Sequence, residues 1–456
     1  MTDLNQILSI GKSALLAQQR AIQTTSHNIA NANTSGYTRQ QVNLSTRPPV
    51  LTAAGMSGTG VQIVSTERIF DPYVDAQIVD QNGAVGQWEA MDQTLAQVDI
   101  IFNETEGGGL NSAFSAFWGA WQDLANNPGG AAERQALLSQ SGILTDNFNQ
   151  MAEDLNQIQT DLTTQIGLAV GEINDMAQEV ADLNDKIFRV ELTGQNANDL
   201  RDKRQLLLND LSRSIGVEVT ENGSYAEVSL GGQPLVEHDQ AYTLSFSDPD
   251  FEIDTPGGPV SVPAGSINGG EVAGWLAARD TVIPQYQTQL DALAAGLIAA
   301  VNTQHAAGYG LGDDTGGTNF FSGTGAADID LNGAIVADPN LIAAAGDPGG
   351  LPGDNQNALA IADLQFAQLL NGGTQTLDEA YQSLVVEVGS DASQASARLD
   401  NETALENHLF NRRQAISGVS IDEETINLLK FEQAYQAASR IITTADEMFA
   451  TLIGMI

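Results

Sequence analysis

The stretch SIDEETINLLKFEQAYQAASRIITTADEMFATLIGMI, residues 420–456, carries apolar side chains at heptad spacing. They form one column of residues seven apart and a second column three residues further on: Ile421, Leu428, Tyr435, Ile442, Phe449 and Ile456, and Phe431, Ala438, Ala445 and Leu452. This spacing is typical of a coiled-coil helix. Ser420 and Glu423 form a Ser-x-x-Glu capping box, which predicts that the helix begins there.

The first helix has the same spacing, with Met1, Leu8, Leu15, Ile22 and Ile29 seven residues apart. A solitary amphipathic helix leaves its apolar stripe in water, and ordering each backbone residue costs about 1–2 kcal/mol. Full burial of one apolar side chain stabilises by about 1.5–3 kcal/mol, but only a minority of the helix residues are apolar. Neither terminal helix is therefore expected to be stable alone. We therefore expect each to pair with the other terminus or with other copies of the chain.

The charges of the two ends favour such pairing. Residues 1–66 hold one acid and the four bases Lys12, Arg20, Arg39 and Arg47, a net charge of +3, whereas residues 416–456 hold six acids and two bases, a net charge of -4. A chance difference in charge between two helices is the alternative explanation. The rest of the chain carries almost all of the total charge of -40.

Helical periodicity also dominates the middle of the chain. It predicts a helix from Asp71, a shorter aromatic helix after residues 106–109, and a long one from about Ala131 to Leu192 that contains Leu162, Ile166 and Ile173. Alternating Val, Tyr and Leu residues between Asn-Gly and Gly-Gly turns predict a small antiparallel sheet at residues 216–265. The fold class is thus mainly α with a small β-rich insertion, in a nested, elongated arrangement.

The nested order predicts three parts. A terminal coiled-coil domain comprises residues 1–66 and 416–456, and a helical bundle comprises residues 67–215, 266–310 and 356–415. The β-rich insertion is 216–265, and the Gly- and Asp-rich residues 311–355 are expected to be loop.

Composition excludes several classes of function. A net charge of -40 over 456 residues repels nucleic acid and anionic membranes, so the expected partners are proteins. The chain has no cysteine, which excludes disulfides and thiol chemistry. We expect no cleaved secretory signal at the N-terminus and no membrane-spanning segment, because no long apolar run is present.

The motifs that suggest enzyme chemistry are weak. Gly11-Lys12-Ser13 lacks the upstream glycine of a phosphate-binding loop and lies within a heptad helix. Residues 328–333, DIDLNG, match half of a calcium loop, but an Asx-rich turn is the better interpretation. The four histidines, His27, His238, His305 and His408, share no metal-site spacing. We therefore expect no cofactor, no metal and no enzymatic activity.

The first helix ends in SHNIANANTSGYTRQ, residues 26–40, a stretch rich in Asn, Ser and Thr. A helix cap needs only one or two such residues, so a cap does not explain the whole stretch. This stretch resembles the signature of the rod, hook and hook-associated axial proteins of the bacterial flagellum. NDLRDKRQLLLNDLS from Asn198, GEVAGWLAARDTVIPQYQTQLDALAAGLIAAVNTQHAAGYGL from Gly270 and SGVSIDEETINLLKFEQAYQAASRIITTADEMFATLI from Ser417 are similar to segments of its hook-associated members.

The resemblance implies a structural role at the junction between hook and filament, needed for filament assembly, after export through the flagellar secretion channel. The implied partners are other copies of the chain in a tube, the hook protein, the next junction protein and a cytoplasmic export chaperone. The candidate subunit contacts are Leu8, Leu15, Ile22, Ile29, Leu428, Phe431, Tyr435, Ile442, Phe449 and Leu452.

The signature loop, with Asn28, Asn31, Asn33, Gly36 and Tyr37, is a further candidate for contact with neighbouring subunits. Packing of this loop within its own chain is the alternative. Three other functions are also considered for the whole chain: another rod- or hook-type axial protein, a secreted coiled-coil effector or adhesin, and a hydrolase hidden in the bundle. The hydrolase lacks a convergent pair of acids.

Overall fold

The computed structural model of the chain describes residues 2–52, 55–103, 108–312 and 316–455. The chain divides into two compact units. Unit 1 contains residues 1–86, 169–270 and 401–456, and unit 2 contains residues 87–168 and 271–400. The helices α2 (Pro72–Phe102), α4 (Ala131–Glu191) and α10 (Leu377–Ser417) contribute residues to both units.

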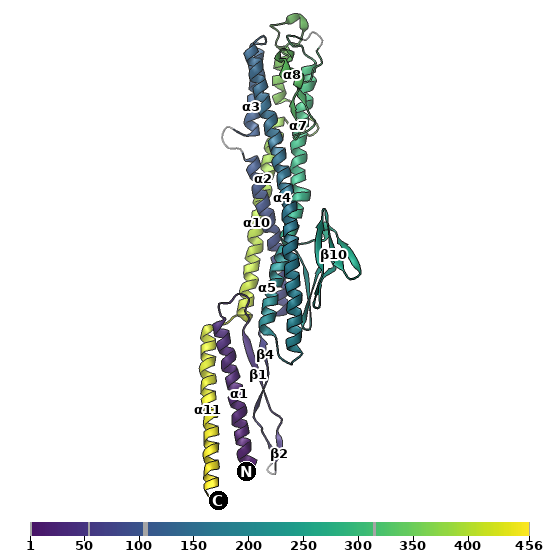
Figure 1. Ribbon diagram of the computed structural model, residues 1–456. Coiled ribbons are helices and arrows are strands. Elements are labelled where there is room, and N and C mark those ends of the chain that lie inside the picture. The colour runs from purple at the N-terminus through teal and green to yellow at the C-terminus, as the bar shows by residue number, and fades with distance from the viewer. Residues whose placement is uncertain (1, 53–54, 104–107, 313–315, 456) are drawn as a thin grey trace. The chain divides into compact units, whose positions relative to one another are not determined.

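In unit 1, both terminal segments are long helices. α1 (Thr2–Ala30) and α11 (Ile421–Gly454) lie side by side and antiparallel, with the two chain ends at the same end of the pair (Figure 1). The Ser420 side chain accepts a hydrogen bond from the Glu423 amide, which caps α11 where the sequence predicted.

A two-stranded ribbon lies against α1. The strands β1 (Gln40–Thr46) and β4 (Val61–Arg68) pair antiparallel, from Gln40 opposite Arg68 to Thr46 opposite Val61, with a bulge between Asn43 and Leu44. A short hairpin of β2 (Val50–Thr52) and β3 (Gly55–Ser57) connects them. Residues 1–66 were predicted to belong to a coiled-coil domain, and the ribbon within them was not predicted.

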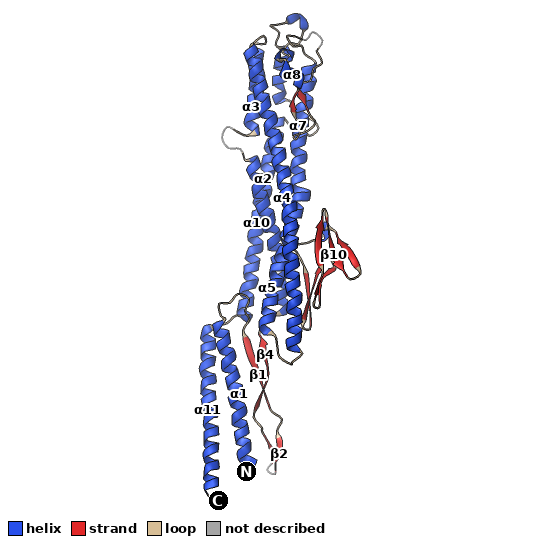
Figure 2. Ribbon diagram, in the orientation of Figure 1, coloured by secondary structure: helices blue, strands red, loops and turns tan. Residues whose placement is uncertain are grey.

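The remaining part of unit 1 combines α5 (Asn198–Ser214) with two small antiparallel sheets (Figure 2). The first sheet has the order β5-β6-β7-β8, and the second has the order β11-β10-β9. The strands are β5 (Glu218–Asn222), β6 (Tyr225–Leu230), β7 (Gln233–Glu237), β8 (Gln240–Ala241), β9 (Thr243–Ser247), β10 (Asp250–Thr255) and β11 (Gly258–Val262). The predicted β-rich insertion is confirmed.

Two asparagines of α4 attach these sheets by imitating a paired strand. The amide of Asn174 accepts from Leu244 N and donates to Leu244 O, at 2.7 and 2.8 Å. The amide of Asn184 does the same with Ala226, at 3.0 and 2.9 Å. The polar edges of the sheets therefore find hydrogen-bond partners on the helix surface.

Unit 2 is a helical bundle with an irregular region. Its remaining elements are α3 (Leu110–Asn126), α6 (Gly270–Ala277), a π-helical segment (Ala278–Val282), α7 (Ile283–Ala306), β12 (Phe321–Ser322), β13 (Asp330–Leu331), α8 (Gly333–Ala337) and α9 (Gln356–Ala362). The π-helical segment ends just before Pro284, which lies in the first turn of α7.

The aromatic residues predicted on α3 form the centre of the unit 2 core. Phe114, Phe117, Trp118 and Trp121 are all fully buried, together with Phe320 and Phe321. Arg134 is also buried there, and its guanidinium donates to three backbone carbonyls, those of Pro128, Pro339 and Ile342. This arginine holds together segments that carry little regular structure of their own.

The prediction of a mainly helical fold with small antiparallel sheets is confirmed. The long helix expected from about Ala131 to Leu192 is α4. Residues 311–355, expected to be loop, contain the short elements β12, β13 and α8. The division into three domains stays a prediction, and residues 216–265 lie in the same compact unit as both termini.

Candidate assembly surface

α1 and α11 pack along a seam, and small side chains are buried on both helices. Ala17 and Ala21 of α1 and Ala438 and Ala445 of α11 are buried. A Cβ atom added to Gly11 would lie 2.8 Å from Ile442 Cγ1, so the two helices approach closely at this point. Gly11 thus allows close helix packing, and the residues 11–13 that resemble a phosphate loop are part of this helix.

The ten predicted subunit-contact residues border this seam. Eight of them are half-buried: Leu8, Leu15, Ile22, Ile29, Leu428, Phe431, Ile442 and Phe449. Tyr435 and Leu452 are exposed, with 39% and 47% of their surface accessible. Their contact with other copies of the chain stays a prediction. Met1 and Ile456, the terminal members of two columns, lie outside the described residues.

A third apolar column lies on α11 and was not predicted from the sequence. Ala434, Ile441, Met448 and Met455 also lie seven residues apart, and Ile441 and Met448 are 45% and 46% exposed. Ile426 and Leu429 are exposed as well. The signal was present in the sequence, but two columns already satisfied the expected coiled-coil pattern. A single chain therefore leaves part of the apolar surface of α11 in contact with water.

The loop at the end of α1 is organised by Asn28, which is almost completely buried. Its Nδ2 donates to Gln40 O at 2.9 Å and to Glu424 Oε2 at 3.0 Å. Its Oδ1 accepts from Tyr37 Oη at 2.7 Å and from Gln40 N at 3.0 Å. One amide therefore joins the end of α1, the start of β1 and the first turn of α11.

Gly36 has a backbone conformation and an environment that both require glycine. Its φ is +77°, and a Cβ atom there would lie 2.5 Å from Leu206 Cδ1. Its carbonyl accepts a hydrogen bond from Arg413 Nη2 at 3.2 Å. The guanidinium of Arg413 also pairs with the buried Asp75 at 3.1 Å.

The other loop residues are partly accessible. Asn31 Nδ2 donates to His27 O at 3.0 Å, which helps to end α1. The Tyr37 ring lies edge-on to His27, with ring centroids 5.5 Å apart, and burial raises the pKa of its hydroxyl. Asn33 is exposed together with its neighbours Thr34 and Ser35. The known contacts of Asn28 and Gly36 lie within their own chain, and a contact of this loop with other subunits stays a prediction.

Glu424 is a buried carboxylate at the first turn of α11. Arg39 binds it, with Nη2 2.7 Å from Glu424 Oε1, and also reaches the neighbouring Glu423 at 3.2 Å. The Arg39 backbone amide donates to Ser417 O at 2.8 Å, between α10 and α11. Burying a carboxylate is unfavourable unless it is paired, so Asn28 and Arg39 together make this arrangement stable.

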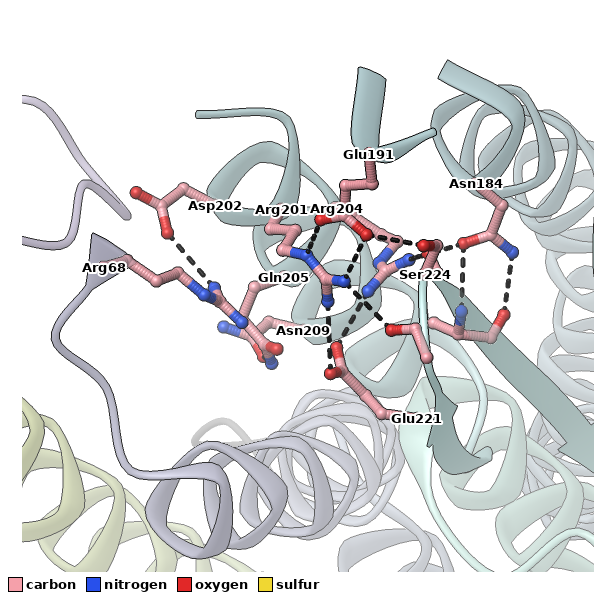
Figure 3. A network of polar contacts seen from close by, with 12 residues as sticks. Arg68, Asn184, Glu191, Arg201, Asp202, Arg204, Gln205, Asn209, Glu221 and Ser224 are labelled. Atoms are coloured by element: carbon pink, nitrogen blue, oxygen red, sulfur yellow. Dashed lines mark hydrogen bonds and ion pairs between the residues drawn. The ribbon is translucent and has the colours of Figure 1, made fainter. Parts of the chain in front are cut away.

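A second set of buried polar contacts continues from the loop into α5 (Figure 3). Asp202 accepts from Thr38 N, from Thr38 Oγ1 and from Arg68 Nη1 at 2.9, 2.7 and 3.2 Å. Burial raises the pKa of Asp202 despite these bonds, and it also raises the pKa of Asp75. The loop is thus fixed to the rest of unit 1 by charged hydrogen bonds.

Two arginines of α5, on either side of Asp202 in the sequence, hold the hairpin of β5 and β6 (Figure 3). Arg204 is fully buried and donates to Asn184 Oδ1 and Ser224 O, both at 2.7 Å, and to Glu221 at 2.9 Å. Arg201 forms a bidentate pair with Glu191 at 2.8 and 2.9 Å. These contacts connect the end of α4 to the first sheet.

Clusters of metal-ligating side chains and membrane-spanning helices were both sought among the described residues. Among them, no group of three His, Asp or Glu side chains could hold a metal ion. Asp328, in the stretch that resembles a calcium loop, accepts hydrogen bonds from the amides of Thr324 and Gly325. None of the described helices has an apolar stretch long enough to cross a bilayer.

Comparison with known proteins decides the family. The sequence is 31% identical over 502 residues to flagellar hook-associated protein 1 of Bacillus subtilis (strain 168), and the match covers 100% of this chain and 99% of that protein. The chain belongs to the flagellar hook-associated protein 1 family. Proteins of the same name from Salmonella typhimurium (strain LT2) and Escherichia coli (strain K12) are 27% and 26% identical over 557 and 551 residues. Both matches cover 99% of this chain and 100% of the relative.

Three family models match separate segments of this hook-associated protein 1 family member. The helical domain of flagellar hook-associated protein FlgK matches residues 95–321. The flagella basal body rod protein model matches residues 8–38, and the C-terminal model of the rod proteins FlgEFG matches residues 413–455. The resemblance inferred from residues 26–40 is thus confirmed, and this family member is a structural component of the bacterial flagellum.

A solved member of the hook-associated protein 1 family shares the fold. The flagellar hook junction protein FlgK from Burkholderia pseudomallei matches with a TM-score of 0.66 and 18% identity, over 75% of this chain and 100% of that chain. At this level of identity the likeness concerns the fold alone.

Proposed function

We propose that this chain forms the junction between the hook and the filament of a bacterial flagellum, and that filaments cannot assemble without it. The observation that best supports this function is the apolar surface that one chain leaves exposed on α11, at Ile426, Leu429, Ile441 and Met448. Copies that stack through their terminal helices would remove this surface from water. Family membership supports the flagellar context.

The structure also supports a separation of tasks within the chain. Residues 1–66 and 416–456 act as the assembling domain, and the ten residues along the α1–α11 seam, with the exposed part of the 28–37 loop, take part in contacts between subunits. The insertion at 216–265 is attached through α4 and α5.

The partners that follow from this proposal are other copies of the chain, the hook protein and the next hook-associated protein. A cytoplasmic chaperone accompanies the chain before export, and the flagellar secretion channel exports it without cleavage of a signal peptide. The acidic surface, with a net charge of -40, favours protein partners over nucleic acid and membrane.

Deletion of the gene tests the proposal. Electron micrographs of the deletion strain are expected to show hooks without filaments, with unpolymerised filament protein in the medium. A plasmid copy of the gene must restore filaments. Filaments of normal number and length in the deletion strain would show that the chain is not the junction protein.

A further inference from the structure

Two basic side chains on α1 make no ion pair within the described residues. Lys12 and Arg20 are exposed, and the Arg20 side chain makes a single hydrogen bond, from Nε to Thr66 Oγ1 at 3.3 Å. Leu16 lies between them and is 49% exposed. The three residues are four positions apart, so they share one face of the helix. This face, the α1 outer face, carries two positive charges around an apolar centre.

The α1 outer face points away from α11. Leu16 is five residues beyond Gly11, which contacts Ile442, and this separation corresponds to about 140° around the helix. The packing of α1 on α11 within one chain therefore leaves Lys12 and Leu16 accessible to another partner, together with the part of the exposed Arg20 that does not bind Thr66.

α11 has an outer face of opposite charge. Leu429 lies nine residues before the buried Ala438, about half a turn around the helix from the seam. Glu447 is five turns beyond Leu429 on the same side, and Glu432 lies close to that line. Arg440 and Asp422 also lie on this side, so the α11 outer face carries three acids, one base and the 54% exposed Leu429.

Two acids of the α11 outer face can pair with basic side chains of another copy. Elsewhere on α11, Glu423 and Glu424 already bind Arg39, but Glu432 and Glu447 make no side-chain hydrogen bond or ion pair in the part of the chain that the structure describes. The two outer faces thus have charges of +2 and -2, and each has an exposed leucine. Within one chain they lie on opposite sides of the helix pair.

Long-range charge also restricts how copies of this protein can meet. With a net charge of -40, two copies repel each other at a distance. Residues 1–66 have a net charge of +3 and can therefore attract an acidic segment of another copy. Lys12 and Arg20 are the basic residues of this segment that lie exposed on a helix. An arrangement that brings this segment against an acidic segment of the next copy offsets the repulsion where the copies touch.

We propose that the α1 outer face of one copy docks on the α11 outer face of a second copy. This inference rests on the proposed function, in which the terminal helices assemble, and it adds which face meets which. The contact is heterologous, because the two surfaces differ, so each copy can bind one neighbour through α1 and another through α11. Such contacts build rings or helical stacks rather than closed pairs.

The absence of cysteine from the chain makes a direct test possible. Cells that lack the native gene would express two tagged variants together, one with Leu16→Cys and one with Leu429→Cys, and oxidation would follow. A disulfide-linked dimer that contains both tags is expected. Cells with either variant alone are expected to give no dimer, because like faces do not meet.

The matched control replaces Leu429→Cys by Ile441→Cys, an exposed apolar residue on a different side of α11. Dimers of Leu16→Cys with Ile441→Cys, dimers from one variant alone, or a disulfide partner of another mass each contradict the inference. If Leu16→Cys prevents filament growth, Lys12→Cys replaces it on the same face.

Filaments on the same cells separate the two proposals. Cells that carry filaments but give no Leu16–Leu429 dimer would overturn the docking arrangement and leave the proposed function intact. Wild-type cells and cells without the gene that carry equal numbers of filaments would overturn the proposed function itself.

Discussion

The Asn28 amide and the Glu424 carboxylate form a hydrogen bond of 3.0 Å across a sequence separation of 396 residues. Both side chains are almost completely buried, at 1% and 2% exposure. The bond joins the end of α1 to the first turn of α11, where Arg39 neutralises the carboxylate. The two terminal helices are therefore fixed at this end by polar contacts, and beyond it the described residues pack along an apolar seam.

Replacement of Asn28 by alanine tests this joint. The change leaves polar atoms of Gln40, Tyr37 and Glu424 without their partner, and each buried orphan costs about 1–3 kcal/mol. A loss of about 2 kcal/mol would speed local hydrogen exchange in residues 421–430 about thirtyfold. Hydrogen exchange with mass spectrometry measures this rate. The control is Asn33→Ala, an exposed position in the same loop; equal exchange in both variants would contradict the assignment.

Gly36→Ala tests the close approach of the loop to α5. Alanine with a positive φ costs about 1–2 kcal/mol, and the collision with Leu206 adds about 1–3 kcal/mol. Gly232→Ala is the matched control, because its φ of +78° is similar and no atom lies within 4 Å of the added Cβ. Unfolding of unit 1 by urea can be measured through hydrogen exchange in peptides from this unit. Gly36→Ala should unfold at a lower urea concentration than Gly232→Ala. The addition of Leu206→Ala should recover part of the loss, and equal stability of the two glycine variants would refute the argument.

His305 makes the stability of unit 2 sensitive to acid. Its ring accepts from Ala343 N through Nε2 at 2.9 Å and bonds Thr318 O through Nδ1 at 2.7 Å, and burial lowers its pKa from 6.5 to about 4. The stabilisation of the neutral form is present above pH 6.5 and is lost as the pH falls from 6.5 to about 4, a change of about 3 kcal/mol. His305→Gln should flatten this dependence.

Tryptophan fluorescence measures this effect, because all four tryptophans, Trp88, Trp118, Trp121 and Trp275, lie in unit 2. Thermal unfolding would be followed between pH 4 and pH 7. The exposed His408 provides the control, and His408→Gln should keep the slope of the wild-type chain. An unchanged slope in His305→Gln would show that another group is responsible.

Leu428→Asp places a charge beside the α1–α11 seam. Burial of a carboxylate in a contact between copies is energetically unfavourable. We therefore expect the Leu428→Asp chain to be exported but not to add to hooks. The measurement is the number of filaments per cell, with the exported chain quantified in the medium. Val386→Asp, at a 70% exposed position on α10, is the control and should leave filament number unchanged. Normal filaments on Leu428→Asp cells would count against this residue as a subunit contact.

The helices were largely predictable because their signals are local. The capping box at Ser420 and the periodicity of α4 placed these helices within a few residues. The ribbon of β1 and β4, in which Val42 pairs with Thr66 and Leu44 with Ile63, was missed because both strands are mostly polar. The role of Glu424 was also missed, because its partners Asn28 and Arg39 are distant from it in sequence.

Hydrogen exchange along α11, in the free chain and in isolated hook–filament junctions, tests the central claim most directly. The account predicts slow exchange near Glu424 in both samples, because the polar joint lies within one chain. It predicts fast exchange from Ile441 to Gly454 in the free chain and slow exchange there in the junction, where neighbouring copies cover the exposed apolar side chains. If residues 441–454 were as strongly protected from exchange in the free chain as in the junction, the claim that neighbouring copies cover this segment would be wrong.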